Sequence, residues 1–181
     1  MSTDISVKKG LGRIADCLVL IKATDGLTLG QICSLSSLEP STIQNWIKRG
    51  YVPHPVCKKY YERHLARILL IAMLRESMQI DRVGELLRYI NGDADDESDD
   101  IISEQALYDL FCEITEVLEQ TYPPPDKAKQ TVCEIVTRIA CDAPQKLMQA
   151  LEIMALAYLS NLYKREADLL FTRFVRYDDG K

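Results

Sequence analysis

Short polar and amide side chains recur along residues 41–49, on one face of a predicted helix. Ile43, Trp46 and Ile47 fall on the opposite face, which their apolar character turns toward a core. Hydroxyl and amide groups at this spacing can hydrogen-bond base edges and phosphates when a helix lies in the major groove of a duplex. The candidate contacts on this helix are Ser41, Thr42, Gln44, Asn45, Lys48 and Arg49.

A second group of basic and aromatic residues follows within about a dozen positions. The stretch YVPHPVCKKYY at 51–61 contains prolines that oppose a helix, with β-forming residues around them, and it predicts a small hairpin or wing. Basic groups beside a recognition helix are what phosphate contacts require. The candidate phosphate contacts are Lys58, Lys59, Tyr60 and Arg63.

Two short helices are predicted to position the first group. Thr28 and Gln31 form a capping box that opens one helix, which the serines at 36–37 end. Pro40 suits the first turn of the second helix, and Gly50 stands where a left-handed C-cap belongs. Two short helices joined by a tight turn indicate a helix-turn-helix.

The rest of the chain predicts helices. Apolar runs favour helices at 65–74 and 81–90, and further helices follow over 106–118, with Ser103 as N-cap, and over 128–139. Asp142 and Gln145 predict the start of a third downstream helix. Its apolar stripe is longer than its neighbours can cover, so part of it is expected to pack against a second subunit. That stripe comprises Leu147, Leu151, Met154, Tyr158, Leu162, Leu169, Leu170 and Phe174.

Charge divides the chain into unlike parts. The net charge is −5, but residues 1–92 hold 13 Lys and Arg against 8 Asp and Glu, whereas residues 93–181 hold 9 against 19. Nucleic-acid binding is therefore not excluded, because binding depends on where charge lies. We predict an N-terminal DNA-binding domain at 1–92, an acidic linker at 93–101 and a helical bundle for dimerisation or effector binding at 102–181. No membrane span or signal peptide is expected, which favours a cytoplasmic location.

Other chemistries have weaker signals. The six cysteines are spread singly and are expected to be reduced and mostly buried. Cys133 and Cys141 are expected to lie about 12 Å apart along one helix, too far to share a metal ion. A pair of Cys57 with a histidine is conceivable as a nucleophile and base, but no third group or phosphate loop accompanies it. We therefore expect neither an enzyme, a metal site nor a cofactor.

The order of these motifs resembles a known family. The stretch LTLGQICSLSSLEPSTIQNWIKRGYVPHP, followed by KKYYERHLARILLIAMLRESMQIDRVGELLRYI, resembles the N-terminal winged helix-turn-helix domain of MerR-type regulators over residues 26–91. Within it, IQNWIKRGYVPHPVCKKY is closer still to a phrase typical of an uncharacterised family, a domain of unknown function from Gram-positive bacteria. Gln44-Asn45-Trp46 stands where MerR proteins usually carry Arg-Tyr-Tyr, so the resemblance implies DNA binding but not MerR-type promoter untwisting.

The expected fold is therefore all-α with a small β-wing, comprising a MerR-like winged helix-turn-helix and a C-terminal helical bundle. The expected function is a transcriptional regulator that binds double-stranded DNA as a homodimer. A small-molecule effector of unknown identity is a further candidate partner of the helical bundle. The alternative is a helical protein-interaction module that has lost DNA binding.

Overall fold

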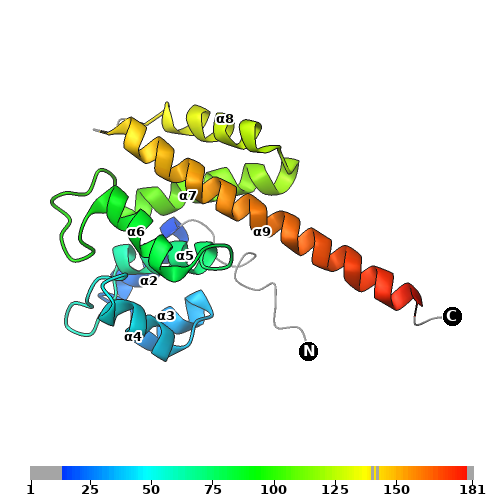
Figure 1. The fold of residues 1–181 in the computed structure, drawn as a ribbon. Coiled ribbons are helices and arrows are strands. Elements are labelled where there is room, and N and C mark those ends of the chain that lie inside the picture. Colours follow the sequence, from blue (N-terminus) through cyan, green and yellow to red (C-terminus); the bar gives the residue numbers. More distant parts are fainter. Residues whose placement is uncertain (1–13, 140, 142, 179–181) are drawn as a thin grey trace.

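The chain is almost entirely helical (Figure 1). A computed structural model describes residues 14–139, 141 and 143–178. The helices of this part are α2 (Ile14–Ala23), α3 (Leu29–Ser36), α4 (Pro40–Lys48), α5 (Glu62–Leu74), α6 (Ile80–Asn91), α7 (Glu104–Thr121), α8 (Pro125–Val136) and α9 (Pro144–Asp178). The predicted all-α class is confirmed, and the β-structure of the described residues consists of two isolated antiparallel bridges.

Helix α5 forms the centre of the molecule. It packs against α2, α3, α6, α7 and α9, and ten of its thirteen residues are buried. The apolar run predicted at 65–74 accounts for this position, because a helix that is apolar on all sides can be covered only from several directions. One hydrophobic core runs from Ile21 in α2 to Leu162 in α9.

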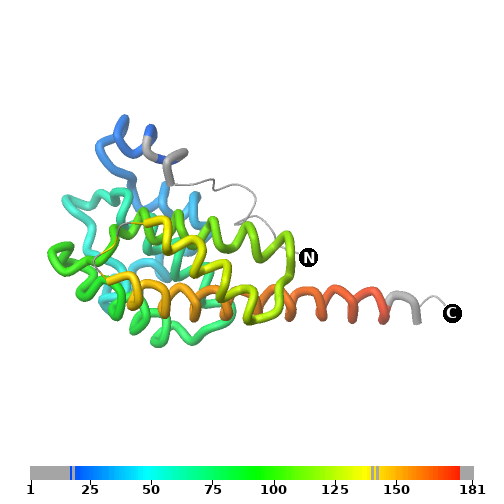
Figure 2. Tube along the Cα trace, turned by 90° about the horizontal axis from the view of Figure 1, so that it is seen from above, coloured from blue at the N-terminus to red at the C-terminus, as the bar shows by residue number. Residues whose placement is uncertain are grey.

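Helices α7, α8 and α9 pack on one another above α5 and α6 in Figure 1, whereas α3 and α4 lie below. The Ser103 hydroxyl accepts a hydrogen bond from the Ala106 backbone N–H and caps α7, as predicted. The second half of α9 extends well beyond the other helices (Figure 2). The capping box predicted at Asp142 lies outside the described residues. Within the described part, no helix is both long and apolar enough to cross a membrane.

Two local expectations are wrong. The second downstream helix ends at Val136 and not at 139. The Arg138 side chain donates to the Glu134 carbonyl at 3.0 Å, and the Ile139 backbone N–H donates to the Val136 carbonyl, only three residues back, so the α-helical hydrogen bonds do not continue. None of the six cysteines is fully buried. Cys57 and Cys133 are exposed, since one lies in a surface turn and the other on the outward side of α8, while the remaining four are half-buried.

Candidate nucleic-acid interface

Helix α4 is fixed at both ends by local backbone geometry. The chain leaves α3 through Ser37, which has a positive φ of 54°, and Pro40 opens α4 two residues after Leu38. At the other end the Gly50 N–H bonds the Ile47 carbonyl and the Tyr51 N–H bonds the Trp46 carbonyl, both at 2.9 Å. This pair of bonds is the Schellman motif that Gly50, with a φ of 71°, makes accessible.

The two faces of α4 divide as predicted. Ile43, Trp46 and Ile47 are buried in the core. Thr42 is half-buried at the edge. The exposed positions are Ser41, Gln44, Asn45, Lys48 and Arg49. The outward side of α4 and its C-cap therefore offer the exposed Ser41 hydroxyl, the half-buried Thr42 hydroxyl, two amides and two cations, with no apolar side chain among them.

Arg49 is partly occupied by the chain itself. Its guanidinium pairs with Asp81 at the start of α6 and lies 4.7 Å from the centre of the Tyr51 ring, and the Tyr51 hydroxyl also donates to Asp81. The Tyr51 ring presses on α6 so closely that a Cβ added at Gly84 would lie 2.5 Å from two ring carbons. These contacts hold the C-terminal end of α4 against α6.

The predicted hairpin is a minimal one. Val56 and Lys59 exchange both backbone hydrogen bonds, at 3.0 and 2.8 Å, and the two residues between them, Cys57 and Lys58, have positive φ angles of 49° and 64°. Two successive positive φ angles are typical of the type I′ turn of a two-residue hairpin. Lys58 is therefore displayed at the tip, where its side chain is exposed.

Tyr60 does not lie on the surface with its neighbours. Its backbone pairs with Leu27, at 2.7 and 2.8 Å, and its side chain is only 4% exposed, with its ring edge-on to His64. Burial raises the pKa of the Tyr60 hydroxyl. The expectation that Tyr60 contacts phosphates is therefore corrected. Lys59 is half-buried and donates to the carbonyls of Thr24 and Gly26, at 3.1 and 3.3 Å.

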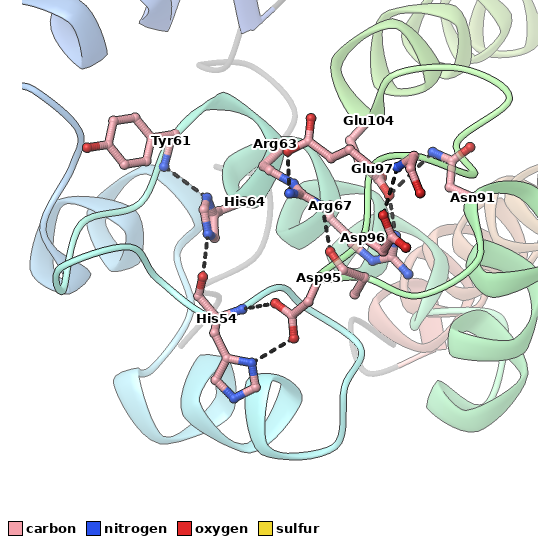
Figure 3. A network of polar contacts seen from close by, with 12 residues as sticks. His54, Tyr61, Arg63, His64, Arg67, Asn91, Asp95, Asp96, Glu97 and Glu104 are labelled. Carbon is pink, nitrogen blue, oxygen red and sulfur yellow. Dashed lines mark hydrogen bonds and ion pairs between the residues drawn. The ribbon is translucent and has the colours of Figure 1, made fainter.

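Arg63 is held by the acidic segment 93–100, which lies within the predicted linker at 93–101. Its guanidinium pairs with Glu97 and donates to the Ala94 carbonyl at 2.6 Å (Figure 3). The segment folds back over the start of α5 because Arg63 supplies the opposite charge there. The expectation that Arg63 is available to phosphates is corrected by this pairing, while the division at 93–101 stays a prediction.

His54 adds a second attachment for the same segment. Its backbone N–H donates to Asp95 at 2.7 Å, and its ring Nδ1 lies 2.8 Å from the other carboxylate oxygen (Figure 3). Burial alone raises the pKa of Asp95, but the hydrogen bonds from His54, its ring charge and Arg63 outweigh burial and lower it. Asp95 is therefore favoured as a carboxylate in this contact.

His64 connects the hairpin to α5. Its Nδ1 accepts from the Tyr61 backbone N–H and its Nε2 donates to the His54 carbonyl, both at 3.0 Å, so the two backbone groups fix one neutral tautomer. Burial lowers the pKa of His64. This side chain caps α5 and joins two parts of the loop, which is a structural role.

A buried ion pair lies behind the interface. Arg67 of α5 and Glu104 of α7 are 2% and 3% exposed and pair with each other, and the Arg67 Nε also donates to the Tyr51 carbonyl at 2.7 Å. The Asn91 amide donates to the Ile102 carbonyl, at 2.7 Å, beside the pair (Figure 3). The loop after α4 is thereby linked to the downstream bundle.

An open depression of about 440 Å³ lies between the hairpin and the acidic segment. His54, Arg63 and Glu97 are among its lining residues, and each of them is already paired as described above. Within residues 14–139, 141 and 143–178, no three His, Cys, Asp or Glu side chains are grouped as metal ligands would be. The outward face of α4 and the hairpin tip carry exposed polar groups, among them Gln44, Asn45 and Lys58.

Sequence reasoning missed the contacts that occupy part of this surface. The pairing of Arg63 with Glu97 and of Arg49 with Asp81 joins residues more than thirty positions apart, which no local pattern reports. One signal was available. In the segment 93–100, six of the eight residues are acidic, and the basic upstream part of the chain offers opposite charges against which this segment can fold.

The part of the chain that contains α4 and the hairpin is similar in sequence to known proteins. The chain is 32% identical over 103 residues to "Uncharacterized protein YkrK" of Bacillus subtilis (strain 168), in a match that covers 55% of this chain and 44% of that protein. The chain thus spans less than half of the length of this relative. No solved structure matches significantly. Residues 23–111, which include α3 to α6 and the first part of α7, match the family described as a domain of unknown function (DUF1836). This match and the Bacillus subtilis relative together support the predicted resemblance to an uncharacterised family of Gram-positive bacteria.

Proposed function

We propose that the chain is a DNA-binding transcriptional regulator that presents α4 to the major groove. The observation that carries the proposal is the face of α4, where Ser41, Gln44, Asn45 and Lys48 are exposed while Ile43, Trp46 and Ile47 anchor the helix in the core. A rigidly held helix with short polar groups and a terminal cation has what direct contact to base edges requires.

The hairpin supports a winged arrangement like that of MerR-type regulators. Leu27, just before α3, pairs with Tyr60, just after the Val56–Lys59 turn, so the hairpin is fixed beside the two-helix unit. Its exposed tip carries Lys58, which can reach a phosphate while α4 lies in the groove. Tyr60 and Arg63 are left out of the proposed interface. Arg49 and Lys59 stay in it as positive charges near the phosphates, with Arg49 held by Asp81 and Lys59 by two backbone carbonyls.

Binding of duplex DNA at low salt tests the proposal. We expect the purified chain to retain random duplexes, and the variants Lys48→Ala and Lys58→Ala to retain them more weakly because each removes one phosphate contact. Lys129→Ala is the matched control, since Lys129 is an exposed lysine on α8, on the opposite side of the molecule. We expect this control to bind as the unaltered chain does.

Two results would overturn the proposal. One is a chain that retains no duplex at low salt, and the other is equal retention by the Lys48, Lys58 and Lys129 variants. Either result would favour the alternative, in which the same exposed face of α4 contacts another protein.

A further inference from the structure

Helix α9 changes the side on which it carries apolar residues. Along its first half Leu147, Leu151, Met154, Tyr158 and Leu162 face the core and are buried. Continued along the same side, most residues of that stripe are polar, and its one further leucine, Leu169, is 54% exposed. The single stripe expected from 147 to 174 is therefore wrong. A helix turns about 100° per residue, so apolar side chains further along lie on a different face.

The second stripe lies on the far side of the helix from the core. Its members, which we call the α9 seam, are Tyr163, Ala167, Leu170 and Phe174. From Tyr163 onward they are separated by alternating steps of four and three residues, which is the average spacing of 3.5 found in coiled coils and not the 3.6 of a helix lying on a globular core.

The seam is exposed to solvent. Each residue from Tyr163 to Val175 is exposed, and this part of α9 stands clear of the other helices in both views (Figures 1 and 2). Leu170 is 55% and Phe174 67% exposed. A row of large apolar side chains on a free helix marks an interaction surface, because exposure to water is unfavourable for each of them.

The seam is complementary to itself when two copies run antiparallel. If Ala167 lies opposite Leu170 of a second copy, two-fold symmetry repeats the same contact and also sets Tyr163 opposite Phe174 twice. The small Ala167 then meets the larger Leu170 in both copies of that layer. A parallel pair in register would instead set Ala167 against Ala167 and leave a gap between two crowded layers.

Charges beside the seam favour the same orientation. Glu166 and Arg173 are seven residues apart and flank the seam on the same side. In the antiparallel register each Glu166 lies beside Arg173 of the other copy, so two symmetry-related ion pairs form. In a parallel pair Glu166 would instead lie near Phe171, and the pairing would be lost.

The antiparallel arrangement also enlarges the contact beyond two short helices. It brings the end of each α9 next to Tyr163 of the other copy, where α9 meets the body of the molecule. There the Tyr163 hydroxyl donates to the Tyr122 carbonyl at 3.0 Å, and the two rings lie edge to face with 6.0 Å between their centres. Tyr122 is itself exposed, so the incoming helix end meets further apolar surface.

We infer that the α9 seam binds a second copy of this chain as an antiparallel two-helix coiled coil. The homodimer expected from the sequence thus uses the outer face of α9, beyond Leu162, and leaves the core face as it is. This interface lies at the opposite end of the protein from α4 and does not depend on DNA binding.

Solution mass and a pair of matched variants test this inference. The unaltered chain is expected at twice its mass of 20.6 kDa by light scattering. Leu170→Lys, in the seam, is expected to raise the dissociation constant of the dimer by about a hundredfold or more, because two cations enter an apolar contact. Leu169→Lys is the control, since Leu169 is about as exposed as Leu170 but lies outside the seam. Circular dichroism should show the same helix content in all three.

Charge reversal tests the orientation. Glu166→Arg is expected to weaken the dimer, and adding Arg173→Glu to it should restore the dimer because the ion pairs reform with opposite sense. A monomeric unaltered chain at about 100 μM, or equal effects of the Leu169 and Leu170 variants, would overturn the seam. Failure of the double reversal to restore the dimer would overturn the antiparallel register.

Discussion

Breaking the buried ion pair between Arg67 and Glu104 is expected to destabilise the whole chain. Both side chains are almost completely buried, and one oxygen of Glu104 has no hydrogen-bond partner among the described residues. Arg67→Met would leave the carboxylate without its cation, at a cost of about 3–5 kcal/mol, and would take the donor from the Tyr51 carbonyl, at a further cost of about 1 kcal/mol. This sum is a large share of the roughly 5–15 kcal/mol by which a domain is stable.

A surface ion pair supplies the control for this prediction. Arg138 pairs with Glu113 at 3.1 Å, and its side chain is 63% exposed. Arg138→Met is therefore expected to cost less than about 1 kcal/mol. Removing both buried charges, in Arg67→Met with Glu104→Met, should cost less than Arg67→Met alone because no uncompensated charge remains.

Urea unfolding followed by circular dichroism measures these differences. The expected order of stability is the unaltered chain, then Arg138→Met, then the double variant, then Arg67→Met. Equal losses in Arg67→Met and Arg138→Met would refute the reasoning, because they would mean that burial adds nothing to the cost. A double variant as unstable as Arg67→Met would refute the claim that the unpaired carboxylate causes the loss.

Two further predictions concern single positions. Gly84→Ala is expected to lower the unfolding free energy by about 1–3 kcal/mol in urea, because the new methyl overlaps the Tyr51 ring. Gly30→Ala, with open space around it in α3, should raise the unfolding free energy by up to about 1 kcal/mol. Equal shifts would contradict the close packing of the Tyr51 ring on α6. Burial and the nearby Glu104 charge raise the pKa of Asp100 to about 6, above its unfolded value near 4, so its contribution to stability is present in acid and is lost as pH rises through 6. Asp100→Asn should therefore stabilise the chain at pH 7.5 relative to its effect at pH 4.5. An effect of this substitution that is independent of pH would contradict the raised pKa of Asp100.

Local signals predicted the elements well where a few neighbouring residues determine them. The capping box of Thr28 and Gln31 is present, with the Gln31 side chain accepting from the Thr28 N–H at 2.8 Å. The left-handed C-cap at Gly50 and the cap at Ser103 are also confirmed. Each of these depends on contacts within four or five residues, which the sequence displays directly.

Features set by distant contacts could not be predicted in this way. Tyr60 and Tyr61 are adjacent and chemically alike, and which of them is buried depends on pairing with Leu27, more than thirty residues away. The reach of Arg63 is likewise decided by Glu97. In α9 the pattern of apolar residues was visible, but the point at which the body of the molecule ends, and the seam begins, was not.

The salt dependence of duplex binding tests the central claim most directly. On a duplex selected for tight binding, the slope of the logarithm of affinity against the logarithm of salt concentration counts the phosphates that the protein neutralises. We predict that Lys48→Ala lowers this slope by about one, while Lys129→Ala leaves it unchanged. Slopes that are the same for the unaltered chain and for Lys48→Ala would contradict the placement of α4 on DNA.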